Sequence, residues 1–245
     1  FDILNGENED LRIYRNSLLS ERIATSDFVF FLAFDVGGSR YLEFHQHTFD
    51  FLHNNVSIME NVFHELNIHQ TPFIFASSQM SNMTYSPYGL AKAIGEKYTD
   101  VLRGLVVKFW NVYAPEHDED KAHVITDFIQ KAKKNNRIDM LTDGQEVRQF
   151  LHGDDCSKCL YTLSQQFDML DKQLEYHITS FEWISIQKIA QIIAGQFPGT
   201  EIIPTKQKDG VQRDKRNEPD PSILRYWQPE IGIKEGIFKI IEEMK

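Results

Sequence analysis

Cysteine is scarce in this sequence: only Cys156 and Cys159 occur among 245 residues, and they form a single CxxC pair. A structural zinc site needs four ligands, and the only histidine close to the pair is His152. We therefore expect no metal site, and we expect the two thiols to pack at the start of a helix. A metal-binding module built from these three side chains is the less favoured alternative.

Long apolar runs are absent too. The longest, 28–34, is far shorter than the roughly 20 residues that a membrane-spanning helix needs. No signal-peptide pattern opens the chain at Phe1. Together with so few cysteines, these features predict a soluble protein of the reducing cytoplasm that has no membrane partner.

Positive charge is in deficit, because 26 Lys and Arg face 36 Asp and Glu, for a formal net charge of -10. An acidic chain repels phosphate backbones, so we expect no nucleic-acid partner. Aromatic residues are plentiful by contrast, with 18 Phe, 9 Tyr and 3 Trp, and this much apolar material excludes a disordered chain. The length allows one large domain or two modest ones with a buried core.

The first half of the chain alternates strand and helix patterns. Three continuous apolar runs predict strands buried on both faces: 27–33, 72–76 and 105–110. Two helices are expected between them, at 47–66 and 87–103. This order is typical of right-handed βαβ units in a parallel sheet. Upstream, 11–15 is a candidate for one more strand, and 20–24 for a short helix after it.

The pattern changes after Pro115. The acidic run 116–120 is expected to be a solvated loop, and 205–221, with two prolines and charges of both signs, is expected to be a longer one. Strands are predicted at 147–155, ending in a turn, and at 176–179; helices are predicted at 124–134, 157–167, 185–197 and 234–244.

Chemistry is expected at the carboxyl ends of the parallel strands, where ligands gather in such sheets. Ser77 and Ser78 end the second strand, and Tyr88 and Lys92 lie one turn apart at the start of the next helix. A cation beside a phenol lowers the pKa of the phenol, which makes it a usable base near neutral pH. A bare YxxxK pair occurs often by chance as an exposed helical pair, but the order strand, Ser-Ser, YxxxK helix, strand is much more specific.

Motifs along nearly the whole chain resemble those of the extended short-chain dehydrogenase/reductase family, in its branch of NAD-dependent nucleotide-sugar epimerases and dehydratases. The similar segments are DFVFFLA at 27–33 (DVVFHLAA in the family), NNV at 54–56, FIFASS at 73–78 (FIFSSS), YGLAK at 88–92 (YGxSK), KFWNVYAP at 108–115 (RYFNVYGP), DGQEVRQFLHGDD at 143–155 (DGxQxRDFxHVDD) and YHITS at 176–180 (YNIGS).

The resemblance implies an α/β fold built on a Rossmann-type doubly wound parallel sheet, with a smaller C-terminal α/β lobe for the substrate. It places an NAD-binding lobe at 1–115, with 176–198 returning to it, and a mainly substrate-binding lobe at 116–245. The implied activity is that of an NAD(P)-dependent nucleotide-sugar epimerase or epimerase/reductase. In it, Tyr88 would deprotonate a sugar hydroxyl while hydride passes to the nicotinamide, with Lys92 holding the ribose and Ser78 sharing the proton.

The resemblance also implies which residues bind each ligand. The expected cofactor-binding residues are Asn16, Leu32, Ala33, Phe34, Asn55, Tyr88 and Lys92. The expected partner is a nucleotide-diphosphate sugar, held by Ser78, Asn111, Arg148 and a second arginine for which Arg213 is favoured slightly over Arg216. A homodimer through the helices that carry Asn55 and Tyr88 is expected as well.

Departures from the family pattern narrow the expected reaction. Gln79 and Met80 stand where dehydratases carry Asp-Glu, so the acid/base pair for water elimination is absent. The AHVI segment at 122–125 resembles SHVIP of the GDP-fucose synthases, whose histidine is an acid/base. His123 is therefore a candidate for a second proton-transfer group; the alternative is a helix-start histidine that only packs near the substrate loop.

The glycine-rich start of the family is absent, since Gly6 is the only glycine before Gly37. LRIYRN at 11–16 resembles the family's third strand, VVRGDL, so about 30 residues or more of the first βαβ unit have no counterpart. We interpret the chain as entering a dinucleotide-binding fold at that strand, which leaves NAD and NADP undistinguished. The alternative is a catalytically silent relative that keeps the fold for binding or assembly, although the intact Ser78, Tyr88 and Lys92 argue against it.

Overall fold

The computed structural model describes residue 1, residues 5–211 and residues 217–244, and the chain forms two compact units. Unit 1 comprises Phe1–Asp35, His45–Phe109 and Tyr161–His177; unit 2 comprises Val36–Phe44, Trp110–Leu160 and Ile178–Lys245. The resemblance placed 1–115 in one lobe, with 176–198 returning to it, whereas here 161–177 belong to unit 1 and both 36–44 and 178–198 belong to unit 2. Residues 161–177 contribute a strand to unit 1, and 36–44 contribute a helix to unit 2.

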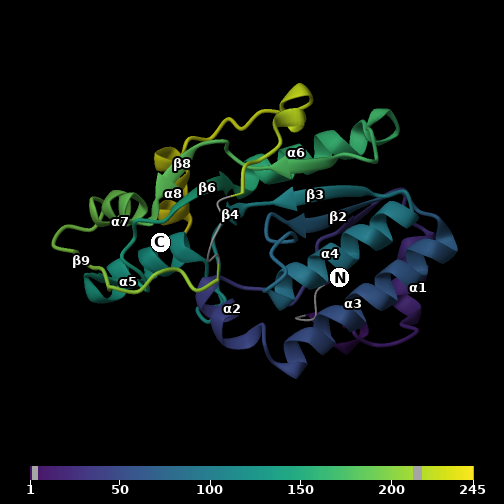
Figure 1. Ribbon diagram of the computed structural model, residues 1–245, viewed down its shortest axis with the longest axis horizontal. Helices are drawn as coiled ribbons and strands as arrows, with labels where there is room; N and C mark the ends of the chain where they lie inside the picture. Colours follow the sequence, from purple (N-terminus) through teal and green to yellow (C-terminus); the bar gives the residue numbers. More distant parts are fainter. Residues whose placement is uncertain (2–4, 212–216, 245) are drawn as a thin grey trace. The chain divides into compact units, whose positions relative to one another are not determined.

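Unit 1 is built on a four-stranded sheet in the order β1-β2-β3-β7, of which β2 and β3 are labelled in Figure 1. Its strands are β1 (Val29–Phe31), β2 (Phe73–Ser78), β3 (Leu105–Phe109) and β7 (Glu175–Ile178). β1 pairs with β2, and β2 with β3, in parallel. All six residues of β2 are buried, as the continuous apolar run predicted. The parallel α/β class expected from the sequence is confirmed.

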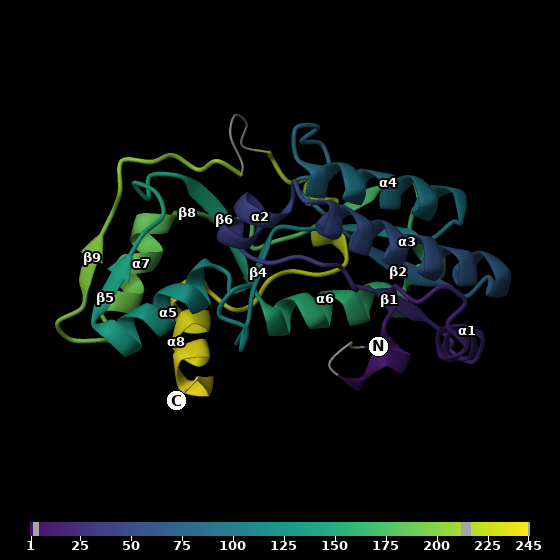
Figure 2. The same ribbon diagram turned by 90° about the horizontal axis from the view of Figure 1, so that it is seen from below.

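Helices α1 (Ser17–Ala24), α3 (Phe49–His69) and α4 (Pro87–Val101) complete the regular structure of unit 1, with a 3-10 turn at Glu7–Glu9 and another at Phe167–Met169. α3 and α4 lie side by side in both views (Figures 1 and 2). α4 packs on β2 because Gly95 leaves room for the ring of Phe75, whose nearest atom would be 2.3 Å from a Cβ at that position. Both helices were predicted, α3 with its start and end shifted by two or three residues.

The strand expected at 11–15 is absent, and this prediction is wrong. These residues form turns, with Arg15 in the left-handed region at φ 55°. Only Leu11 is buried, where its carbonyl accepts a 2.8 Å hydrogen bond from Asn61 Nδ2, while Ile13 and Tyr14 are 44% and 63% exposed. A single buried residue supplies no face that a neighbouring strand could cover.

Unit 2 contains two small sheets. β4 (Asn111–Tyr113) pairs in parallel with β6 (Val147–His152), which pairs in antiparallel with β8 (Trp183–Ser185). β5 (Arg137–Asp139) and β9 (Glu201–Ile203) form a parallel two-stranded sheet. The helices are α2 (Ser39–His45), α5 (Val124–Asn135), α6 (Gly153–Gln165, which continues into unit 1), α7 (Ile186–Ala194), α8 (Ile233–Glu243) and a 3-10 helix at Pro221–Arg225.

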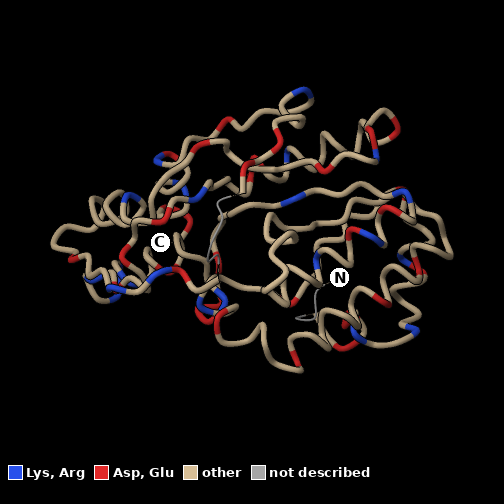
Figure 3. Tube along the Cα trace, viewed as in Figure 1, with Lys and Arg blue, Asp and Glu red and all other residues tan. Residues whose placement is uncertain are grey.

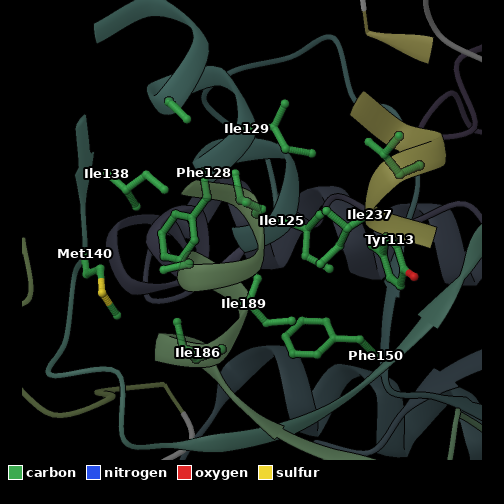
Figure 4. Packing of buried hydrophobic residues seen from close by; sticks show 14 residues of the cluster. Tyr113, Ile125, Phe128, Ile129, Ile138, Met140, Phe150, Ile186, Ile189 and Ile237 are labelled. Carbon is green, nitrogen blue, oxygen red and sulfur yellow. The ribbon is translucent and has the colours of Figure 1, made fainter. Parts of the chain in front are cut away.

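The core of unit 2 is formed by the apolar faces of three helices. Ile125 and Phe128 from α5, Ile189 from α7 and Ile237 from α8 belong to one buried cluster with Phe150 of β6 (Figure 4). Along α5, buried apolar residues recur every three or four positions, and this spacing predicted an amphipathic helix. The same core explains why helices α7 and α8 appear where the sequence pattern placed them.

The two cysteines are free and buried on α6. Burial raises the pKa of the Cys156 thiol to about 12 and that of Cys159 further still, so both behave as small apolar side chains. No group of three or more potential ligands that could hold a metal occurs among the described residues.

Charge is mixed along both units, with Lys and Arg interspersed among Asp and Glu (Figure 3). In the part of the chain that the structure describes, no helix combines the length and apolarity needed to cross a bilayer.

A glycine inside α8 marks a close approach between unit-2 elements. A Cβ at Gly236 would lie 1.9 Å from Tyr113 Oη and 3.0 Å from His152 Cδ2. Tyr113 is 3% exposed, so its ring has little room to move away. Only glycine fits here without displacing β4.

We expect Gly236→Ala to destabilise the protein by about 1 to 2 kcal/mol in chemical denaturation, because overlap outweighs the gain in helix propensity. Adding Tyr113→Phe removes the overlapping oxygen and should restore part of the loss. Gly195→Ala is the matched control, since Gly195 has a helical φ of -63° and its nearest neighbour would be an ordinary 3.4 Å away. Equal stability of the two alanine variants would contradict this account.

Candidate active site

Unit 1 brings together the three residues that the sequence grouped. Ser78 ends β2, and Ser86 caps α4 by accepting a 3.1 Å hydrogen bond from the backbone of Gly89. This places Tyr88 and Lys92 on the first turns of the helix, 9% and 4% exposed. Ser78 Oγ accepts a 3.2 Å hydrogen bond from Met80 N, and Lys92 Nζ lies 5.9 Å from the centre of the Tyr88 ring.

Burial dominates the electrostatics of this cluster. It raises the pKa of Tyr88 to about 12, against the opposing hydrogen bond from Ser78. It also lowers the pKa of Lys92 to about 7, against the opposing charge of Glu96. The predicted lowering of the Tyr88 pKa by Lys92 is therefore not what the structure shows. Instead, Lys92 Nζ donates a 2.6 Å hydrogen bond to the Ala76 carbonyl.

An ionic network of Glu96, Lys108 and Glu175 lies one helical turn beyond Lys92. Sequence analysis missed it. Glu96 accepts a hydrogen bond from the Ser77 hydroxyl, and its Oε1 lies 3.5 Å from Lys108 Nζ. Lys108 also pairs with Glu175 at 2.6 Å. Glu96 follows Lys92 by one helical turn, and that spacing is the signal that identifies it as a neighbour in the sequence.

The segment after β1 carries the expected cofactor residues. The Phe34 ring lies 3.6 Å from Lys92 Nζ and meets Tyr88 edge-on. Leu32, which is exposed, and Ala33 line a cavity of about 470 Å³ beside β1. Phe34 thus borders the Tyr88 cluster, and Leu32 and Ala33 border an open cavity in the same unit.

Two other expected cofactor residues have structural partners. Asn55 is fully buried, and its amide bonds both backbone groups of Asp35, at 2.7 and 3.0 Å, which holds the turn after β1. Asn16 caps α1 by accepting from Leu18 and Leu19, and its Nδ2 donates to the carbonyls of Asn8 and Asp10.

The remaining site residues belong to unit 2. Asn111, His123 and Arg148 line one pocket of about 120 Å³. Asn111 Nδ2 donates to the Gln149 carbonyl at 3.0 Å. Arg148 donates to the Val147 carbonyl at 2.7 Å and to the Asp209 carboxylate. Arg213 and Arg216 lie outside the described residues.

Charge in this pocket is balanced. Its lining holds four cationic side chains (Arg40, Lys131, Arg148 and Lys208) and four carboxylates (Glu43, Asp127, Glu146 and Asp209). Arg148 pairs with Asp209, 61 positions away in sequence, and Lys131 pairs with Asp127 at 2.7 Å. Sequence analysis identified Arg148 but had no means of finding Asp209, because a contact over that separation leaves no periodic pattern.

Comparison with known proteins places these observations in a family. The profile of the NAD dependent epimerase/dehydratase family matches residues 7–179. The chain is 29% identical over 170 residues to a putative UDP-glucose 4-epimerase of Methanocaldococcus jannaschii. These aligned residues make up 65% of this chain and 53% of that protein. It is 27% identical to a GDP-L-fucose synthase of Sinorhizobium fredii, over 54% of this chain and 44% of the relative. The chain thus spans about half the length of these curated relatives.

Solved structures share the fold. A UDP-glucose 4-epimerase of Thermotoga maritima superposes with a TM-score of 0.79 at 16% identity, covering 96% of this chain and 82% of that one. An epimerase of Methanothermobacter thermautotrophicus gives a TM-score of 0.81 at 17% identity, covering 95% of this chain and 76% of that one. These likenesses confirm the Rossmann-type architecture predicted from the sequence.

The buried Lys92 makes stability depend on pH in a defined window. Its pKa is about 7 in the folded protein and about 10.4 in an unfolded chain, so between these values only the unfolded state binds the proton. We expect the free energy of unfolding to rise with pH from about 7 to 10, relative to Lys92→Met, by up to about 1.4 kcal/mol per pH unit. Below pH 7 the difference should be flat.

Chemical denaturation from pH 6 to pH 9.5 measures this difference while tyrosines stay protonated in the unfolded chain. Lys97→Met is the matched control, because Lys97 is on the same helix but exposed. Parallel pH curves for the two variants would show that Lys92 is not desolvated as described.

Proposed function

The chain belongs to the NAD dependent epimerase/dehydratase family, and we propose that it acts as a nucleotide-sugar epimerase or epimerase/reductase. The observation that carries this proposal is the buried cluster of Ser78, Tyr88 and Lys92 at the end of β2 and the start of α4. A serine, a tyrosine and a lysine at neighbouring positions of one buried cluster can serve proton transfer to and from a hydroxyl group. Burying the amine of Lys92 costs free energy, and a relative that only binds ligands or assembles into complexes would gain nothing in return.

The residues of unit 1 fit NAD, the cofactor for which the family is described. The ammonium group of Lys92 has three N–H donors and uses one on the Ala76 carbonyl, so further donors can bind ribose hydroxyls. The segment 32–34 follows a parallel strand at its carboxyl end, where dinucleotides lie in such sheets. When bound, NAD supplies a hydride acceptor for the sugar carbon.

The roles of the three side chains follow from their hydrogen bonds and charges. Tyr88 Oη would take the proton of a sugar hydroxyl, with Ser78 hydrogen-bonded to the same oxygen. Because burial holds the pKa of Tyr88 near 12, the phenol needs a neighbouring positive charge before it can act as a base at neutral pH. Lys92 is the cation within this cluster, and Glu96 favours its charged form.

Epimerisation or reduction is favoured over dehydration. Gln79 and Met80, which follow Ser78, are 6% and 4% exposed, and neither side chain can act as an acid or base for loss of water. His123 of unit 2 is the further proton-transfer candidate.

We propose that the substrate is a nucleotide-diphosphate sugar bound in the unit-2 pocket. Arg148 offers a planar fork suited to phosphate oxygens, and Asn111 lines the same pocket. Arg213 is proposed as a second phosphate ligand from its place in the sequence. A cytoplasmic location is proposed with it, because both cysteines are free thiols.

A homodimer through α3 and α4 is also proposed. These adjacent helices expose a row of apolar side chains at helical spacing, a kind of patch that a second copy can cover. The row comprises Leu52 and Val56 on α3 and Leu90, Ile94, Tyr98 and Val101 on α4.

Turnover tests the catalytic proposal. We expect Tyr88→Phe in the intact protein to lower epimerisation of UDP-glucose or GDP-mannose by at least about 100-fold, because a positioned acid/base contributes 10²- to 10⁴-fold. NAD binding, measured by calorimetry, should be retained. Full turnover in Tyr88→Phe would refute the mechanism, and no NAD binding by the wild type would favour the silent relative.

Analytical ultracentrifugation tests the dimer. The double variant Val56→Glu with Ile94→Glu should sediment as a monomer at concentrations where the wild type is a dimer. The free energy needed to bury two carboxylates exceeds the free energy gained by burying the apolar patch. Tyr161→Glu, which changes an exposed aromatic side chain elsewhere in unit 1, should leave the dimer intact. A monomeric wild type, or a dimeric double variant, would exclude this interface.

A further inference from the structure

One carboxylate of unit 2 contacts His123 through both of its oxygens. Glu116 Oε2 accepts the backbone N–H of His123 at 2.8 Å, and Oε1 lies 2.6 Å from His123 Nδ1. His123 is the N-cap residue of α5, so the same carboxylate also meets the positive end of that helix. The sequence placed Glu116 in a solvated acidic loop; this prediction holds for 117–120, which are exposed, but is wrong for Glu116, whose side chain is 26% exposed.

The charge of Glu116 determines which nitrogen of the imidazole carries the proton. Burial would raise the pKa of this carboxyl, but the hydrogen bonds and the charge of His123 outweigh burial and hold the pKa below its ordinary value. An ionised carboxylate only accepts hydrogen bonds, so Nδ1 of His123 must be the donor. Neutral His123 then has a lone pair on Nε2.

Nε2 is the nitrogen left for a ligand. His123 lines the unit-2 pocket and its side chain is 40% exposed, whereas Glu116 does not line that pocket. No hydrogen bond to Nε2 of His123 is formed by the residues that the structure describes. The imidazole therefore has one nitrogen held by Glu116 and one without a hydrogen-bond partner among the described residues.

The backbone that carries His123 is held from its other side as well. Gly38 N donates to the Lys121 carbonyl at 2.9 Å, and a Cβ at Gly38 would lie 2.4 Å from the Ala122 carbonyl oxygen. Only glycine permits this close packing of the segment before α2 against residues 121–123. The imidazole is thus fixed by its own backbone, by Gly38 and by Glu116.

We propose that Glu116 is a positioning residue that holds His123 in the Nδ1–H tautomer, so that Nε2 transfers a proton to and from the sugar. This proposal rests on the proposed function for its substrate. In the forward step an N–H bond forms at Nε2, the X–H bond of the sugar breaks, and its electron pair stays on the sugar. The resulting imidazolium is paired with the Glu116 carboxylate, and the reverse step returns the proton.

The tautomer can be read without any substrate. In intact protein labelled with ¹⁵N-histidine, the signals of His123 are assigned by their loss in His123→Asn. We expect wild-type His123 at high pH to show a protonated Nδ1 and an unprotonated Nε2. Glu116→Gln should give a mixture or the opposite tautomer, because an amide can donate to Nδ1 as well as accept from it. Glu119→Gln, which alters an exposed carboxylate of the same run, should match the wild type.

Kinetics supply the second arm, with UDP-glucose and GDP-mannose as probes. We expect Glu116→Gln to lower kcat by roughly 10- to 100-fold, as loss of a partner that orients a functional histidine does elsewhere. KM should change little, and His123→Asn should lower kcat at least as far. Thermal unfolding of Glu116→Gln close to the wild type would show that folding is intact.

The outcomes separate this inference from the proposed function. An unchanged tautomer in Glu116→Gln overturns the positioning role, whatever the activity. Normal kcat in His123→Asn, with kcat lost in Tyr88→Phe, overturns proton transfer at His123 and leaves the epimerase proposal standing. If the wild type converts neither sugar, the proposed function fails, while the tautomer result still decides whether Glu116 orients His123.

Discussion

Burial of strand β2 against helix α4 is the constraint on which the candidate site depends. All six residues of β2 are buried, and Gly95 lets α4 approach closely enough to enclose the ring of Phe75. The strand therefore ends with Ser78 beside the first turns of α4, where Tyr88 and Lys92 lie. The packing that stabilises unit 1 is thus the packing that assembles its polar cluster.

The same burial has an electrostatic cost that shapes the chemistry. Removing Tyr88 and Lys92 from water raises the pKa of the phenol and lowers that of the amine, so both neutral forms are favoured. Glu96, anchored by Ser77 and Lys108, is the charge that opposes this for Lys92. The pKa values of Tyr88 and Lys92 therefore depend on burial and on the charge of Glu96, and the YxxxK spacing alone does not describe them.

In unit 2, by contrast, cationic side chains of the pocket are paired with carboxylates of the same pocket. Arg148 is matched by Asp209, and Lys131 by Asp127, within a pocket of balanced charge. Any anion that binds Arg148 would have to compete with the Asp209 carboxylate. His123 is likewise paired with Glu116, whose Oε1 lies 2.6 Å from His123 Nδ1.

The sequence by itself determined the parallel α/β class, the main strands and helices, and the grouping of Ser78, Tyr88 and Lys92, because hydrophobic periodicity and helical spacing are local properties of a chain. It missed β5, β8 and β9, because each is only three residues long and too short to show a recognisable pattern, and it wrongly expected a strand at 11–15. Only the tertiary structure decided the partners of Arg148 and Lys108, the turn held by Asn55, and the direction of the pKa shift at Tyr88. These depend on contacts between distant segments and on exclusion of water, neither of which is present until the chain has folded.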